Sequence, residues 1–273
     1  MRTHLIVFQH MAAALYLAAG VGAILGLVLP APKVLHGARW GLALGALAQG
    51  AAFGTLHRLE AAPALTDLGQ AIGIMGWLGV LFTLALLSRF RLSGFVPPLA
   101  FVGFLSAFGA TLSSSNVSSR PLAPSADVFG SIPHAHVLLA SAGIAALGIA
   151  ALAGFFFLLE HRSLKTRRRV SGWLSLPLPS LETLDRVNRL TLILGFPLLT
   201  LGVLTGSLWL YSSSGLLFSG SLHEAWTIIA WMIYMGLVAL RFGRHQGARQ
   251  AAASAVAGFS FLVFAVVGVG LVT

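Results

Sequence analysis

Long runs of apolar residues, separated by short polar stretches, make up most of this chain. A helix of about 20 apolar residues spans the hydrocarbon core of a bilayer, and eight runs approach or exceed that length. They cover residues 5–29, 38–57, 66–88, 94–112, 134–160, 186–211, 223–241 and 250–272. Because an unpaired backbone amide in lipid is costly, each run predicts a helix. We therefore expect an all-α, polytopic membrane helical bundle of about eight transmembrane helices.

Prolines and glycines refine this pattern. Pro97 and Pro98 open the fourth run, where the first turn of a helix tolerates proline. Pro197 lies inside the sixth run and predicts a kink. Pairs of glycines four residues apart favour close helix packing; they are Gly41 with Gly45, Gly69 with Gly73, and Gly202 with Gly206.

The composition agrees with a membrane protein. Of the 273 residues, 57% are hydrophobic and 9% are charged, against about 25% charged in a soluble domain. The chain has no cysteine, which excludes disulfides, thiolate ligands and thiol catalysis. No small-residue cleavage site follows the first run, so we expect a retained helix and a single transmembrane domain over residues 1–273.

The distribution of the basic residues predicts an orientation. Only Arg2, Arg58 and Arg120 of the 17 Lys and Arg residues lie outside the loops that follow helices one, three, five and seven. The positive-inside rule then places both termini of this multi-pass protein outside. The net charge of +10 indicates contact with anionic lipid in the bilayer rather than with nucleic acid.

The two longest loops differ in character. Residues 113–133 are polar, rich in serine and expected outside, whereas residues 161–185 are strongly basic and expected inside. Apolar side chains such as Trp173 and Leu174 are interleaved with the basic ones. This pattern suits a segment lying on anionic headgroups; a solvated loop is the alternative.

Several histidines share the outer side of the predicted bundle. His57 ends the second helix, His136 lies near the start of the fifth, and His223 opens the seventh. A neutral imidazole is the usual axial ligand of haem iron. The alternative is an interfacial histidine that bonds water or a carbonyl. Glu224, in the first turn of the seventh helix, is stabilised by the helix dipole.

One stretch is more specific than a lipid-facing helix requires: Gly195-Phe-Pro-Leu-Leu-Thr-Leu-Gly-Val-Leu-Thr-Gly-Ser-Leu-Trp209. It resembles the sixth helix of the CcsA/HemX (YpjD-like) cytochrome c assembly family. In this resemblance Glu224, Trp226, Trp231 and Arg241 match the Trp-rich "WWD" segment and the end of helix seven. His136-Val137 is similar to the first external haem-ligand site of the family, and His57 to a histidine of its HemX/YpjD-like members.

The chain also departs from the family pattern. Phe218-Ser-Gly220-Ser-Leu-His223 stands where the family has Trp-x-Trp-Asp-Pro-Lys, and Ala239 replaces a histidine. Gly268-Val-Gly-Leu-Val272 lacks the second external histidine. The resemblance is therefore nearer to the HemX/YpjD branch, with a degenerate WWD segment.

The resemblance implies a haem-binding or haem-handling inner-membrane protein that acts in cytochrome c biogenesis or in the regulation of haem biosynthesis, and not an enzyme. Haem b would be held by His136, His57, His223, Trp226, Trp231 and Glu224, with His136 and His57 as axial ligands and no catalytic residue. The implied partners are haem, the lipid bilayer, and cytochrome c assembly proteins or glutamyl-tRNA reductase. The alternatives are a membrane scaffold without haem and a small-molecule transporter.

The charge distribution makes the topology testable. A cysteine at Ser115, in the loop expected outside, should react with a membrane-impermeant thiol reagent in intact cells. A cysteine at Ser171, in the basic loop, should react only after the cells are opened. The reverse pattern of labelling would contradict both the orientation and the outer position of the histidines.

Overall fold

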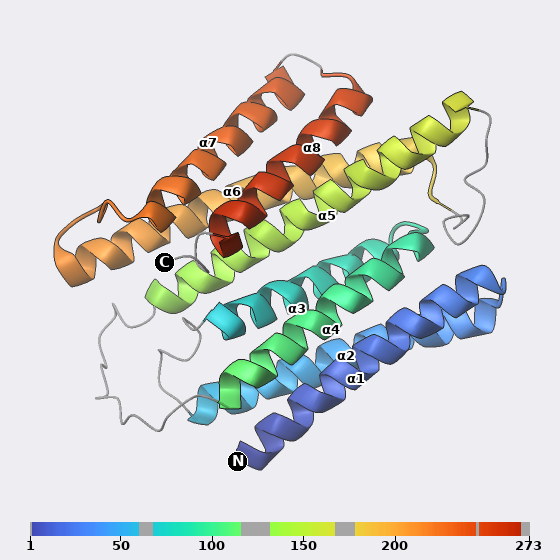
Figure 1. Ribbon diagram of the computed structural model, residues 1–273, viewed down its shortest axis with the longest axis horizontal. Helices are drawn as coiled ribbons and strands as arrows, with labels where there is room; N and C mark the ends of the chain where they lie inside the picture. Colours follow the sequence, from blue (N-terminus) through green and yellow to red (C-terminus); the bar gives the residue numbers. More distant parts are fainter. Residues whose placement is uncertain (1, 60–67, 116–131, 167–177, 244–245, 269–273) are drawn as a thin grey trace. The chain divides into compact units, whose positions relative to one another are not determined.

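All regular structure in the described part of the chain is helical (Figure 1). The computed structural model describes residues 2–59, 68–115, 132–166, 178–243 and 246–268. The helices are α1 (Arg2–Val28), α2 (Pro32–Leu59), α3 (Leu68–Leu87), the short η2 (Ser93–Phe95), α4 (Val96–Ser115), α5 (Ile132–Thr166), α6 (Leu181–Ser214), α7 (Leu222–Gly243), α8 (Ala248–Val263) and the π-turn η4 (Phe264–Gly268). The predicted all-α class is confirmed.

Seven of the described helices are long and apolar enough to cross a membrane, so the chain is a multi-pass membrane protein. The exception is α2, whose apolarity is lowered by polar residues such as Lys33, Arg39 and Gln49. This helix nevertheless runs back along α1, because Leu35 lies against Gly26 near one end and Leu56 packs with Leu5 near the other. It therefore covers the same depth as α1.

The helices form two compact units, one of α1 to α4 and the other of most of α5 with α6, α7 and α8. In the first unit, α1 and α2 approach closely at two of the predicted glycines. A Cβ atom added to Gly41 would lie 3.3 Å from the Cβ of Ala19, and one added to Gly45 would lie 2.7 Å from the ring of Tyr16. The pair of Gly41 and Gly45 therefore serves packing, as predicted.

Buried hydrogen bonds join the helices of the first unit. The Tyr16 hydroxyl donates to Oε1 of Gln49 at 2.8 Å, and Nε2 of Gln49 donates to the carbonyl of Gly73 at 3.0 Å. The indole of Trp77 likewise donates to the carbonyl of Ala46 at 2.8 Å. Because an unpaired polar group in an apolar interior costs several kcal/mol, these bonds constrain how α1, α2 and α3 can pack.

In the second unit α5 is the most buried helix: 67% of its most apolar stretch is inside the protein. Its small residues allow two neighbours to come close. A Cβ atom on Gly143 would lie 2.5 Å from the backbone nitrogen of Leu199 in α6, and one on Gly154 would lie 2.7 Å from the carbonyl oxygen of Ala252 in α8. By contrast, only 11% of the corresponding stretch of α7 is buried.

Several predicted boundaries were wrong. The fifth helix was expected to end at residue 160 and the sixth to begin at residue 186, but α5 continues to Thr166 and α6 begins at Leu181. The cause at the second boundary is the cap of Ser180, whose hydroxyl accepts the backbone N–H of Thr183 at 3.3 Å. Much of the expected inner loop 161–185 is thus helical, and its centre, with Trp173 and Leu174, lies outside the described residues.

Other sequence features have mixed outcomes. Pro97 and Pro98 lie in the first turn of α4, as predicted, and Pro197 lies inside α6. The expected kink at Pro197 stays a prediction, as does the single transmembrane domain. The last helix continues from α8 into a π-turn over Phe264–Gly268, and the end of the expected run, 269–272, lies outside the described residues. The loop expected outside has its centre, 116–131, outside the described residues.

The close approach at Gly45 makes a prediction about stability. The change Gly45→Ala should destabilise the protein by about 1–3 kcal/mol, because the new methyl group overlaps the Tyr16 ring. The matched control is Gly54→Ala in the same helix, where nothing lies within 4 Å of the added atom. Thermal unfolding in detergent, followed by circular dichroism, should show a lower midpoint for the first variant alone; equal midpoints would contradict the packing.

Candidate functional site

The turn between α6 and α7 is built around Glu224. Gly215, with φ of 72°, ends α6 in a left-handed conformation that glycine adopts without strain. The Glu224 carboxylate then accepts the backbone N–H of Ser219 at 2.8 Å, while its own N–H donates to the hydroxyl of Ser221 at 3.3 Å. The position in the first turn of α7 was predicted, and the structure adds that the carboxylate stabilises the preceding turn.

Trp231 connects α7 to α6. Its indole N–H donates to the hydroxyl of Thr200 at 3.0 Å, and its ring stacks on Phe196 with a centroid separation of 6.2 Å. The Thr200 hydroxyl in turn donates to the carbonyl of Phe196 at 2.9 Å. The Phe-Pro-x-x-Thr part of the quoted stretch therefore supplies both the ring and the hydroxyl that hold this tryptophan.

Trp226 connects α7 to the other neighbouring helix. Its ring contacts Phe261 of α8 at a centroid separation of 5.8 Å and meets Phe264 edge to face at 5.7 Å. The two tryptophans thus face different helices, in keeping with the angle of about 140° between positions five residues apart. They do not form one aromatic surface.

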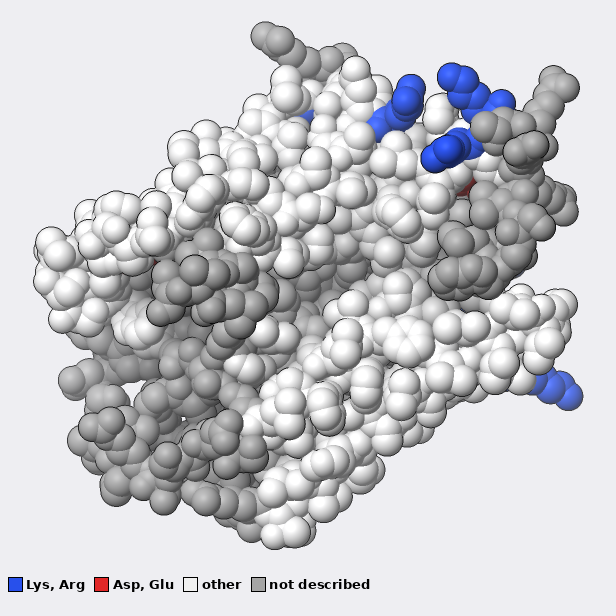
Figure 2. All heavy atoms as spheres, viewed as in Figure 1, with Lys and Arg blue, Asp and Glu red and all other residues white. Residues whose placement is uncertain are grey.

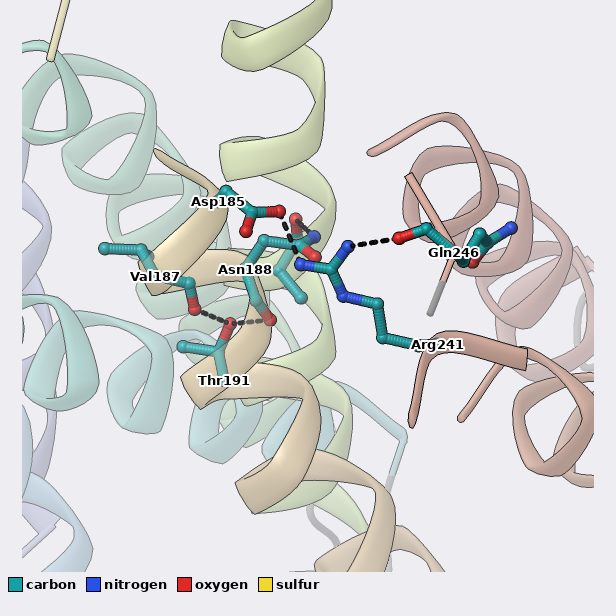
Figure 3. Close-up of polar contacts among 7 residues, drawn as sticks. Asp185, Val187, Asn188, Thr191, Arg241 and Gln246 are labelled. Atoms are coloured by element: carbon teal, nitrogen blue, oxygen red, sulfur yellow. Dashed lines mark hydrogen bonds and ion pairs between the residues drawn. The ribbon is translucent and has the colours of Figure 1, made fainter. Parts of the chain in front are cut away.

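The far ends of the same helices are joined by a partly buried ion pair (Figure 3). Arg241, in the last turn of α7, donates to a carboxylate oxygen of Asp185 in α6 at 2.5 Å. Its other terminal nitrogen donates to the backbone carbonyl of Gln246 at 3.3 Å. The Arg241 side chain is 8% exposed and that of Asp185 is 31% exposed, so solvent screens the pair only in part.

Further polar contacts surround this ion pair. Nδ2 of Asn188, one turn along α6 from Asp185, donates to the carbonyl of Ala150 in α5 at 2.7 Å (Figure 3). Arg189 places its guanidinium 5.7 Å from the centre of the Phe242 ring. We call Asp185, Asn188, Arg189, Arg241 and Gln246 the α6–α7 polar cluster. It fixes α6 against α5 and α7 at the end of the unit remote from Glu224.

The sequence interpretation missed this cluster, because it placed Asp185 in a loop. The signal that was present is the run Ser180-Leu-Glu-Thr183, a helix start with an N-cap serine and an acid in the first turn. If the run 180–183 is interpreted as a helix start, Asp185 falls in the first turns of the sixth helix. Nothing in the sequence alone pairs that residue with Arg241, which lies 56 positions away.

The predicted histidine ligands occupy three helices. His136 is half-buried in the second turn of α5, while His57 lies in the last turns of α2 and His223 in the first turn of α7. The side chains of His57 and His223 are outside the described part of the structure. The haem site as a set therefore stays a prediction, whereas Trp226, Trp231 and Glu224 are shown to stabilise α7 and its turn.

Charged side chains are sparse: Asp, Glu, Lys and Arg make up 9% of the residues. In Figure 2 most of the face in view is uncharged, and the Lys and Arg side chains that it shows lie mainly toward its upper right. Together with the helical architecture, this defines a multi-pass helical membrane protein. The family model of the cytochrome C assembly protein matches residues 65–273, and the chain belongs to that family.

Curated relatives match a shorter part of the chain. The cytochrome c biogenesis protein CcsA of Prochlorococcus marinus (strain MIT 9303) is 37% identical over 97 residues, which are 36% of this chain and 30% of the relative. The CcsA proteins of Thermosynechococcus vestitus and Microcystis aeruginosa are 34% and 33% identical over 90 residues, which are 33% of this chain and 28% and 27% of the relatives. The matched segments thus span less than a third of these relatives.

The polar cluster predicts a measurable coupling between α6 and α7. In a double-mutant cycle, Asp185→Asn and Arg241→Gln should show an interaction free energy of about 1–2 kcal/mol in unfolding, because the two side chains share one hydrogen-bonded network. The matched control is Glu182 with Arg186 on the same helix, an exposed pair at 3.2 Å that should couple by only about 0.3–0.5 kcal/mol. Additive effects of the first two changes would rule out the cluster as an interhelical restraint.

Proposed function

We propose that this protein handles haem in the bacterial inner membrane during cytochrome c biogenesis, without being an enzyme itself. The observation that carries the proposal is the family match over residues 65–273, which includes α5 with His136 and the whole of α6, α7 and α8. CcsA, the name of the curated relatives, is given to a cytochrome c biogenesis protein. The covered share of those relatives is small, so the activity rests on the family rather than on one of them.

His136 is the first axial ligand in this proposal, with His57 or His223 as the second. The donors present fit haem iron, since imidazole nitrogen is one of its common axial ligands and His136 is half-buried at the start of an apolar helix. When bound, haem with its iron in place would be the group that is passed on to another protein. The residues of this chain would hold the iron through imidazole nitrogen and orient the porphyrin.

The turn and the tryptophans have supporting roles in the proposed site. The Glu224 carboxylate and the Glu224 backbone N–H both form hydrogen bonds with the turn that precedes α7. These bonds hold the backbone of the adjacent His223 in a fixed position at the start of α7. Trp226 and Trp231 hold α7 against α8 and α6. We therefore assign them to positioning the histidine, in place of the direct part in holding haem that the family resemblance implied.

The finer assignments belong to the same proposal. The replaced tryptophans at Phe218 and Gly220, and Ala239 in place of a histidine, support the HemX/YpjD branch over a complete haem-presenting CcsA site. Control of haem biosynthesis through glutamyl-tRNA reductase would then be a role of that branch. The arrangement of basic residues supports outer termini, and a single transmembrane domain over residues 1–273 is part of the same proposal.

The optical spectrum of the purified full-length protein tests the proposal. The protein, supplemented with haem b during expression, should show a Soret band of a six-coordinate haem. His136→Ala should lower the haem content by roughly tenfold or more, since even the partners of a metal ligand contribute 10–100-fold to affinity. His245→Ala, on the basic side, is the control and should leave the spectrum unchanged.

Two results would contradict the proposal that this protein handles haem. One is full haem occupancy after His57, His136 and His223 are all replaced by alanine. The other is a protein that never takes up haem although it folds and inserts, in which case a scaffold without haem becomes the better account. Thermal unfolding of each variant separates loss of ligand from loss of fold.

A further inference from the structure

The loop between α6 and α7 is unusually apolar for a connection at the end of two membrane helices. No Asp, Glu, Lys or Arg occurs between Arg189 and Glu224, so the loop is free of charge throughout. It displays three consecutive apolar side chains, Leu216, Leu217 and Phe218, which are between 48% and 62% exposed. Such exposure of consecutive apolar residues marks a surface for another molecule or for lipid.

We infer that residues 215–222 lie in the interfacial layer of the bilayer and that their apolar side chains insert among the lipid headgroups. The inference goes beyond the proposed function, because it needs no haem. The apolar surface of the loop is covered by lipid, in the leaflet at the end of the helices opposite the α6–α7 polar cluster. A water-exposed loop and a contact with a second protein are the competing arrangements.

The first argument comes from helix length. At 1.5 Å per residue, α6 covers about 30 Å between Arg189 and Trp209, and α7 covers about 30 Å between Arg241 and Leu222. Each distance equals the thickness of the hydrocarbon core, and the two basic ends lie together, because Arg189 contacts Phe242. Trp209 and Leu222 therefore mark the opposite boundary of the core. Because α6 continues past Trp209 only to Ser214, the loop 215–222 begins within about 8 Å of that boundary and ends at it.

The second argument is continuity with the lipid-facing surface. The exposed side of α6 near the loop carries Leu204, Leu208, Trp209 and Tyr211. Tryptophan and tyrosine are enriched at the boundary between hydrocarbon and headgroups. The exposed Leu204 and Leu208, which precede this aromatic pair along α6, face lipid because the protein is a multi-pass membrane protein. The apolar loop continues the same surface by a few residues, into the headgroup layer.

The third argument is that the loop satisfies part of its own backbone. The N–H groups of Gly215, Leu216, Ser219 and Ser221 all donate within the loop or to the adjoining helices. Backbone donors that are already bonded can leave bulk water at little cost, whereas unpaired ones cannot. The Glu224 carboxylate also accepts one of these bonds, so the nearest charge is engaged with the backbone of the loop.

The position of the loop can be measured by depth-dependent quenching. The chain has no cysteine, so Leu217→Cys allows one NBD fluorophore to be attached to the full-length protein in phosphatidylcholine nanodiscs. Leu201→Cys, an exposed position in the middle of α6, is the control inside the hydrocarbon. Arg249→Cys, on the exposed basic end of α8, is the control in water.

At Leu217 we expect strong quenching by a lipid that carries a spin label near the headgroup. We also expect iodide quenching at least about threefold weaker than at Arg249. Both follow because an inserted side chain lies within the headgroup layer, where dissolved iodide has little access. Iodide quenching equal to that at Arg249, without lipid quenching, would overturn the inference and leave a water-exposed loop. Because the nanodisc holds no partner of this protein, a loop that serves to bind a partner would give the same overturning result.

Two further variants guard against a local effect of the label. Leu216→Cys and Phe218→Cys report the same loop and should give the same ranking of quenchers. With the fluorophore at Phe218→Cys, the added change Leu217→Gln should increase iodide quenching, because it makes insertion less favourable without adding a charge that repels iodide, whereas Leu217→Ala should do so less. Equal effects of glutamine and alanine would contradict insertion. Haem binding can be present or absent in all these variants, so the two proposals fail independently.

Discussion

The need to satisfy every polar backbone and side-chain group away from water shapes both units of this protein. Helices satisfy the backbone internally, but the side chains of Gln49, Trp77 and Asn188 must find acceptors on neighbouring helices. Each donates to a backbone carbonyl, of Gly73, Ala46 and Ala150 respectively. Such bonds form only where two helices come close, and this requires small residues along the contact.

Glycine and alanine supply that proximity. Gly45 receives the ring of Tyr16, whose hydroxyl then reaches Gln49. In the second unit Gly143 brings α5 against the backbone of α6 at Leu199, and the two helices are further joined through Asn188. Close packing and polar satisfaction therefore depend on each other: a larger residue at the contact would separate the helices and leave the polar groups unpaired.

The sequence predicts some of these features and not others, for physical reasons. A long apolar run satisfies its backbone in lipid by forming a helix, so the lengths of the apolar runs predicted eight helices. The four-residue spacing of glycines identified the contact positions Gly41 and Gly45 of α2. Helix ends depend on local capping, and the cap at Ser180 was overlooked, which misplaced Asp185. The pairing of Asp185 with Arg241 depends on how α6 and α7 lie relative to each other, and a local sequence pattern does not predict that arrangement. The partners of Trp226 and Trp231 were missed for the same reason.

The second unit is asymmetric from one membrane surface to the other. At one end, the charges of the α6–α7 polar cluster hold α6 and α7 together; at the other, a charge-free loop connects the same helices. Trp231 and Thr200 join them in between. Haem is itself a largely apolar plate with two carboxylates, so it partitions into the headgroup layer, where we place the loop and the start of α7. If both proposals hold, haem reaches His223 from the lipid surface, and the missing tryptophans of the family segment are replaced by side chains that hold the turn in the membrane.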